Sequence, residues 1–299
     1  MEVVESCIVV PSEETPKHSI WLSNLDLSFS VREHTPSVYF YRPNGDPDFF
    51  KVETLKASLS KALVQFYPLA GRLEVGKNGR IEINCTGEGV QFTVIRSEYD
   101  VDKFGGFAPS HEMREALVPR VASSEPPCVL LMIQVTFFKG GEVTIGVANH
   151  HIAADFHFIK TWTDIARGIS DVSFPPFFDR SHLRARSPPS ITADLLEYKK
   201  PPQSESNTFT APPPFDVAIL NLSRNQITTL KKRVSIDKSL STFKAVIAHI
   251  WRSACFARRL AADQDTRLYT VRRCPLDTSA TRSSARQRER RRGRSRQGR

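Results

Sequence analysis

Two adjacent histidines and an aspartate are the side chains of this sequence whose types and spacing best suit acid–base chemistry. They lie in one short run, Asn149-His150-His151-Ile152-Ala153-Ala154-Asp155. A neutral imidazole is the usual base near pH 7 for taking a proton from a hydroxyl or an amine. His151 stands four residues before Asp155, a spacing at which a carboxylate can fix the geometry around an imidazole. The run predicts His151 as a general base and Asp155 as the residue that orients it.

The same run has less specific interpretations. A histidine followed four residues later by an aspartate often occurs by chance, and histidine pairs can also bind metals. Zinc-binding helices carry two histidines four residues apart, whereas His150 and His151 are adjacent and lack a convincing further ligand nearby. We therefore predict no metal site. We also expect the base to be His151 and neither His150 nor His157.

The elements around this run predict how it is positioned. Residues 143–148 alternate β-branched with smaller or polar side chains, which indicates a strand. Residues 128–139 and 142–148 are expected to form a hairpin around Gly140-Gly141. From residue 156 to 168, apolar side chains recur at spacings of three and four, which predicts a helix. The junction of a strand and a helix is a rigid place from which to aim a catalytic side chain into a crevice.

The rest of the chain predicts an α/β protein. Strands are expected at 3–9, 37–41, 73–75, 80–83, 90–95 and 216–222, and helices at 52–66, 223–232 and 243–259. Ser223 and Gln226 have the spacing of a capping box at a helix start. Arg72 joins a helix to a hairpin, so a structural role is favoured over anion binding. Residues 168–214 are rich in proline and have little periodicity, which indicates a linker between two domains.

Several motifs together carry a family resemblance. Asn-His-His-x-x-x-Asp at 149–155 and Phe-Tyr-Pro-Leu-Ala-Gly-Arg-Leu at 66–73 are similar to two hallmarks of the plant BAHD acyl-CoA-dependent acyltransferases. Residues 34–43, 79–83, 134–139 and 248–253 resemble the subgroup of hydroxycinnamoyl-CoA:shikimate/quinate hydroxycinnamoyltransferases. The resemblance runs from about residue 4 to residue 270.

The resemblance implies a fold and an activity. The fold is a two-domain α/β CoA-dependent acyltransferase (chloramphenicol-acetyltransferase-like) fold with mixed sheets and flanking helices. Its N-terminal domain would span 1–168, a crossover linker 169–214 and part of a second domain 215–270. The activity is transfer of a hydroxycinnamoyl-type group from CoA to a hydroxyl or an amine. Acyl-CoA is then a co-substrate, and no cofactor is expected.

The resemblance also implies two sets of binding residues. Positions close to the acceptor pocket match His34, Ser37 and Tyr39. Positions near the CoA phosphates match Ser241, Thr242 and Lys244, whose hydroxyls, helix-end amides and cation suit an anionic group. Each set has a structural alternative. Tyr39 also fits a half-buried strand aromatic, and residues 241–244 fit an ordinary capped helix with a solvated lysine.

Two departures from the family pattern modify this expectation. Asp155 runs directly into a helix, without the glycine and the short segment that follow it in the family, and after Thr270 an Arg/Ser/Gln-rich sequence replaces family-like strands. We expect an incomplete second domain, a disordered tail at 271–299 and weak or absent turnover, with a tendency to aggregate. The alternative function is a catalytically impaired relative or a non-catalytic binding protein.

Charge and composition narrow the partners and the compartment. Residues 271–299 contain 11 Arg and two acidic residues, so they account for nine of the ten net positive charges. The body is therefore close to neutral, and nucleic acid is expected to bind only non-specifically through this tail. The five scattered cysteines fit reduced thiols. Without a signal peptide or an apolar membrane-length run, we expect a cytoplasmic monomer whose partners are an acyl-CoA and a small alcohol or amine.

Overall fold

The computed structural model describes residues 1–27, 34–46, 48–105, 107–123, 125–153, 156–169, 176, 178–180, 183–184, 219–234, 240–261, 264, 266 and 268. The chain divides into two compact units, Met1–Ala218 and Ile219–Arg299. Asp155, the tail at 271–299 and most of the linker at 169–214 lie outside the described residues. The finer domain boundaries given above therefore stay predictions.

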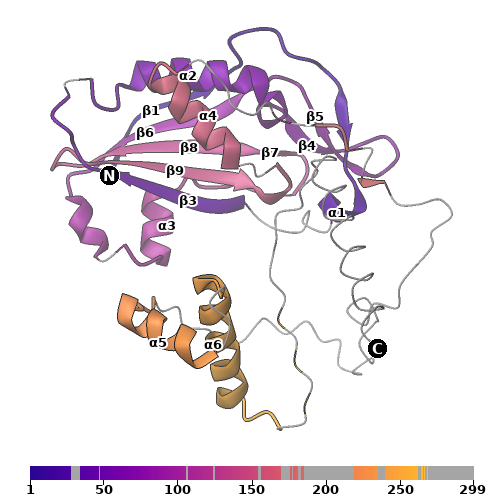
Figure 1. The fold of residues 1–299 in the computed structure, drawn as a ribbon. Coiled ribbons are helices and arrows are strands. Elements are labelled where there is room, and N and C mark those ends of the chain that lie inside the picture. The colour runs from indigo at the N-terminus through magenta and orange to yellow at the C-terminus, as the bar shows by residue number, and fades with distance from the viewer. Residues whose placement is uncertain are drawn as a thin grey trace. The chain divides into compact units, whose positions relative to one another are not determined.

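A five-stranded mixed sheet forms the centre of the first unit (Figure 1). From edge to edge its strands are β1 (Glu2–Val9), β6 (Val90–Arg96), β8 (Leu131–Phe137), β9 (Val143–His150) and β3 (His34–Tyr41). β6 and β8 run parallel, and all other neighbours are antiparallel. β8 and β9 are the hairpin expected around Gly140-Gly141. Gly141 has a φ of 88°, a conformation that glycine adopts without steric cost.

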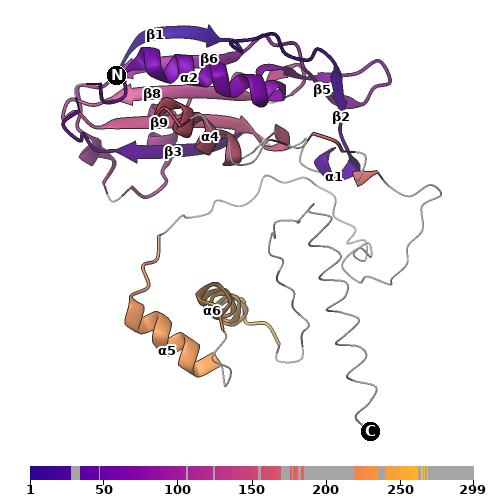
Figure 2. The same ribbon diagram turned by 45° about the horizontal axis from the view of Figure 1, so that its top comes forward.

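Helices cover both faces of this sheet, which accounts for the almost continuous burial of β8 and β9. α2 (Val52–Gln65) and α4 (Phe156–Ala166) pack together on one face, and Figure 2 shows both in front of the strands. α3 (His111–Leu117) packs on the other face. Successive side chains of a strand point to opposite faces. Odd-numbered residues of β9 therefore face the α2–α4 core, and even-numbered residues face α3.

The α2–α4 contact shows how the apolar stripes of the two helices become fixed. Trp162 of α4 is fully buried, and its Nε1–H donates to the Leu55 carbonyl oxygen at 3.0 Å and to Ser58 Oγ at 3.1 Å. Phe158 meets Phe66 edge to face, with ring centroids 5.5 Å apart. Burying a large apolar side chain contributes roughly 1.5–3 kcal/mol. These anchors hold the start of α4 against the sheet.

A smaller sheet extends the first unit. Its strands, in order, are β2 (Ser19–Trp21), β5 (Ile81–Asn84), β4 (Arg72–Val75) and β7 (Cys128–Val129). The 3-10 helix η1 (Tyr67–Ala70) ends α2 and leads into β4. Arg72 donates to the carbonyl oxygens of Gly71 and Gly89 and forms an ion pair with Glu88. The structural role favoured for Arg72 is thus confirmed.

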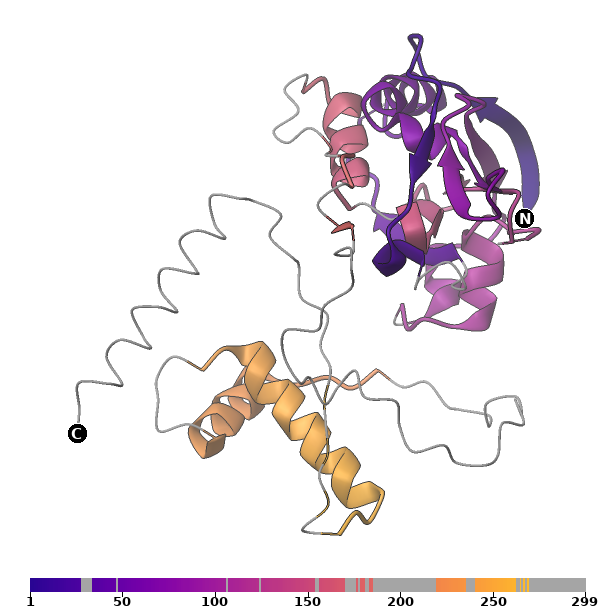
Figure 3. The ribbon, with the colours of Figure 1, turned by 90° about the vertical axis from the view of Figure 1, so that its right-hand side faces the viewer.

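The described residues of the second unit form two packed helices, α5 (Arg224–Val234) and α6 (Thr242–Ala257), which Figure 3 shows side by side. The capping box before α5 is present. The Ser223 amide donates to Gln226 Oε1 at 2.7 Å, and the Gln226 amide donates to Ser223 Oγ at 3.3 Å. The strand expected at 216–222 is wrong for its described part, because residues 219–222 have no regular structure. None of the helices in the described ranges has both the length and the apolar character needed to cross a membrane.

Several short elements are absent from the sequence expectations. They are β2, α1 (Asn24–Leu27), α3 and the 3-10 helix η2 (Val101–Phe104). Each spans too few residues to display a clear periodicity. α3 is nevertheless well defined, because Ser110 caps it by accepting the Met113 amide, and because Met113 and Leu117 are buried. Burial against the sheet thus stabilises a helix that its own sequence signals only weakly.

The closest approach between α3 and the sheet gives a first prediction. A Cβ atom added to Gly146 would lie 1.7 Å from the Leu117 carbonyl oxygen, so the backbones must separate. We expect Gly146→Ala to lower the free energy of unfolding by about 1–3 kcal/mol in urea denaturation, as overpacked sites do. Gly140→Ala is the matched control, because the atoms nearest to its Cβ would be side-chain carboxylate atoms of Glu142 and Asp100 and not backbone. Equal stability of the two variants would contradict the tight α3 contact.

Candidate active site

His151 is the first residue beyond β9 and opens the 3-10 helix η3 (His151–Ala153). β9 is hydrogen-bonded to β8 along one edge and to β3 along the other. The strand therefore delivers His151 from the interior of the sheet, as the sequence predicts. The His151 side chain is half-buried. Asp155 lies outside the described residues, so its orienting role stays a prediction.

A second apolar cluster lies beneath the His151 turn. Ile152 of η3 is buried in it, together with Leu22, Ile83 and the thiols of Cys85 and Cys128. Burial raises the pKa of each thiol to about 11, from an ordinary value of 9.0. Both thiols are therefore protonated at neutral pH, and a protonated thiol is a poor nucleophile. Within the described ranges, no group of three or more His, Cys, Asp or Glu side chains is arranged to hold a metal ion.

His34 and His150 form a buried pair at the end of the β3–β9 ladder. They are direct partners in the antiparallel register, and their rings meet edge to face with centroids 5.0 Å apart and an interplanar angle of 86°. His34 is 3% exposed and His150 is 0% exposed. His34 Nε2 lies 2.8 Å from the Val129 carbonyl oxygen, which can only accept, so this nitrogen donates.

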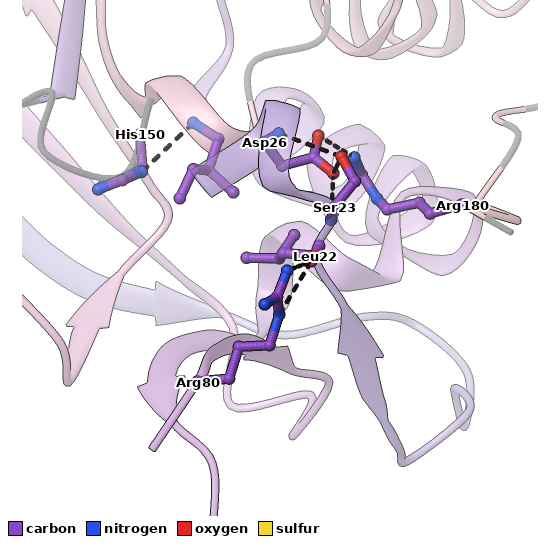
Figure 4. A network of polar contacts seen from close by, with 7 residues as sticks. Leu22, Ser23, Asp26, Arg80, His150 and Arg180 are labelled. Carbon is purple, nitrogen blue, oxygen red and sulfur yellow. Dashed lines mark hydrogen bonds and ion pairs between the residues drawn. The ribbon is translucent and has the colours of Figure 1, made fainter. Parts of the chain in front are cut away.

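His150 also contacts the turn that follows it. The Ile152 amide donates to His150 Nδ1 at 3.4 Å, the contact drawn as a dashed line beside His150 in Figure 4. This bond spans His151, because it joins the residue before it to the residue after it. The first turn of η3 is thus tied to a side chain that the sheet buries.

The three predicted acceptor residues of β3 do not share a face. His34 lies on the face that carries Val38 and Phe40, which pack towards α3. Ser37 and Tyr39 occupy the opposite face, and Tyr39 packs against the α2–α4 core. Burial raises the pKa of Tyr39. Tyr39 therefore has the half-buried position of the structural alternative, and the acceptor role of His34, Ser37 and Tyr39 stays a prediction.

A polar network fixes residues 22–26 near the same cluster (Figure 4). Arg80, which precedes β5, donates to the Leu22 carbonyl oxygen at 2.8 Å, and the Ser23 amide donates to Asp26 Oδ2 at 2.8 Å. Arg180 forms an ion pair with Asp26 at 2.5 Å. Arg180, which lies in the expected linker, therefore contacts the body of the first unit.

Residues of the same segment line a small pocket beside the His151 turn. Phe178 packs on Tyr67, with ring centroids 5.1 Å apart. Phe178 and Arg180 line one side of a cavity of about 160 Å³, and Ile152 and Ala153 line another. The walls are mostly apolar, which continues the cluster under η3.

The predicted CoA-binding residues lie at the start of α6 in the second unit. Ser241 is the N-cap, and its Oγ accepts the Lys244 amide at 3.2 Å. Ser241, Thr242 and Lys244 are all exposed. The expected capped helix is present, and the binding role of its first residues stays a prediction.

Comparison with known proteins decides the family. A family model described as the Transferase family matches residues 1–274. The chain belongs to the BAHD acyltransferase family. The mixed sheets and flanking helices of this BAHD chain confirm the predicted acyltransferase fold class.

Two BAHD relatives and one solved structure illustrate the similarity. Shikimate O-hydroxycinnamoyltransferase of Nicotiana tabacum is 47% identical over 90% of this chain, which spans 64% of that relative's length. Putrescine hydroxycinnamoyltransferase 2 of Oryza sativa subsp. japonica is 42% identical over 88% of this chain and is covered to 86%. The crystal structure of vinorine synthase is 27% identical with a TM-score of 0.60, and the match covers 87% of this chain and 62% of that one.

Two features of this BAHD site are missed by sequence reasoning. One is the pairing of His34 with His150, which needs the β3–β9 register that no local pattern contains. The other is the ion pair between Asp26 and Arg180, whose residues are far apart in the chain. Asp26 and Ser23 do have the local spacing of a cap, and this is the one signal that could have drawn attention to the segment.

The buried thiols give a second prediction. We expect Cys85 and Cys128 to resist alkylation by iodoacetamide at pH 8 in the folded protein, because their raised pKa values and burial remove the reactive thiolate. Peptide mass spectrometry measures the modification, with half-buried Cys255 as an internal comparison and the urea-unfolded chain as the control. The neutral thiols stabilise the fold below pH 9, and this contribution is lost as the pH rises towards 11. Rapid labelling of folded Cys85 would contradict the assignment.

Proposed function

We propose that this chain transfers a hydroxycinnamoyl-type acyl group from CoA to a hydroxyl or an amine, with His151 as the general base. The observation that carries the proposal is the position of His151, at the buried end of β9 in a chain that belongs to the BAHD family. A rigid strand end holds a base more reproducibly than a free loop does.

The reaction needs only the acceptor, the thioester and the base. Nε2 or Nδ1 of neutral His151 takes the proton of the acceptor hydroxyl or amine, and the freed electron pair attacks the thioester carbonyl. The tetrahedral oxyanion collapses, the C–S bond breaks, and the departing CoA thiolate takes the proton back from the imidazolium. No acyl-enzyme forms, since the base activates the acceptor directly. In this proposal acyl-CoA is a co-substrate and no cofactor takes part.

The substrate class follows from the relatives. Their names give shikimate and putrescine as acceptors, so an alcohol and an amine are both represented. Ser37 and Tyr39 are the candidate acceptor contacts, and Ser241, Thr242 and Lys244 are the candidate contacts to CoA. Asp155 is the candidate orienting residue. We further propose that the chain acts as a cytoplasmic monomer.

The third prediction tests the base. We expect His151→Ala to lower acceptor-dependent release of CoA from p-coumaroyl-CoA by about 10²- to 10⁴-fold, the usual cost of losing a general base. Release is measured with shikimate and putrescine in parallel, as free thiol. His157→Ala is the matched control and should retain the parent rate, because His157 lies on α4 beyond the strand end.

The ratio of the CoA-release rates of these variants tests the proposed base even where the absolute rate is low. Equal rates for His151→Ala and the parent protein would overturn the proposed base. Absence of acceptor-dependent release from the parent protein, together with a thermal shift on adding CoA, would identify a binding protein and overturn the proposed activity.

A further inference from the structure

The strand end that carries His151 is fixed by two other imidazoles. His34 and His150 lie opposite each other in the β3–β9 register, and both side chains are buried. A buried histidine pair is unusual, because each polar ring nitrogen needs a hydrogen-bond partner, whereas an apolar side chain needs none. The hydrogen-bond partners of the two rings therefore indicate the role of the pair.

The hydrogen bonds of the pair define one tautomer for each neutral ring. The Val129 carbonyl oxygen can only accept, so His34 Nε2 carries a proton. The Ile152 amide can only donate, so His150 Nδ1 carries none and accepts in the neutral form. The pair thus connects the end of β7 to β3, β3 to β9, and β9 to the backbone just after His151.

We propose that His34 and His150 are positioning residues that hold the backbone on both sides of His151, so that its imidazole meets the acceptor at a fixed angle. The proposal gives His34 a role different from acceptor binding, because at 3% exposure it offers almost no surface to a ligand. The catalytic consequence rests on the proposed function. A misplacement of about 1 Å at a reacting group can cost on the order of 10²-fold in rate.

Side-chain amides can replace one imidazole nitrogen at a time, which gives matched variants. Asn places an amide oxygen near the position of Nδ1, and Gln places an amide nitrogen near the position of Nε2. His150→Asn therefore keeps the acceptor for the Ile152 amide, whereas His150→Phe keeps the ring and loses the acceptor. His34→Gln keeps the donor to Val129, and His34→Phe loses it.

The fourth prediction concerns kinetics. We expect His150→Phe to lower kcat by about 10- to 100-fold with little change in the KM for p-coumaroyl-CoA, because the base is displaced while the donor site is untouched. His150→Asn should recover most of the lost kcat. His34→Phe should lower kcat by a smaller factor than His150→Phe does. His34→Gln should recover most of that loss. Thermal melts of all four variants identify any loss of activity that comes from unfolding.

Hydrogen exchange supplies a measurement that does not depend on turnover. The Ile152 amide should exchange slowly in the parent protein and in His150→Asn, and at least about tenfold faster in His150→Phe, because its acceptor is gone. If His150→Phe does not fold, the His34 variants provide the same comparison, since His34 supports the His150 ring edge to face.

The outcomes separate this proposal from the proposed function. Equal exchange at Ile152 in the parent protein, His150→Asn and His150→Phe would overturn the positioning role. So would faster exchange with an unchanged kcat. Slow exchange that is lost in His150→Phe, in a parent protein without turnover, would support the fixed turn and would overturn only the acyltransferase activity.

Discussion

The structure of the first unit depends on the confinement of β9. The strand is hydrogen-bonded along both edges, and its faces are covered by the α2–α4 core on one side and by α3 on the other. Because interiors are packed as densely as crystals, a strand held in this way has almost no freedom to slide or tilt. The residues that follow it inherit this rigidity. A base that must meet its acceptor within a fraction of an ångström is well served by such a support.

Local sequence patterns predict the elements whose structure depends on residues close together in the sequence. The β8–β9 hairpin follows from its glycine turn, α4 from the spacing of Phe158 and Trp162, and the start of α5 from Ser223 and Gln226. Pairings between distant segments lack such signals. The parallel contact of β6 with β8, and the register of β3 on β9, depend on which apolar faces fit together in the folded chain. For this reason the sequence predicts His151 at a strand end, where the structure has it, but does not show that His34 pairs with His150.

The side chains on the two faces of β3 have different surroundings and different proposed roles. Alternation sends His34 towards α3 and the His150 ring, while Ser37 and Tyr39 lie on the side of the α2–α4 core. Substitution on one face can change contacts near the core without altering the support of the His151 turn. Substitution at His34 acts through that support. A single strand of eight residues thus carries both functions, because neighbouring side chains have different surroundings.

The β3–β9 register also has a consequence for how the protein acquires its site during synthesis. β3 ends at Tyr41 and its partner strand begins at Val143, so about a hundred residues separate the two edges of this ladder. Long-range pairings of this kind form late and slowly, since the closure entropy of the intervening chain must be overcome before any contact compensates for it. A nascent chain that has released β3 from the ribosome carries His34 but no partner for it. The histidine pair, and with it the fixed turn at His151, comes into existence only when the whole of β9 has been translated.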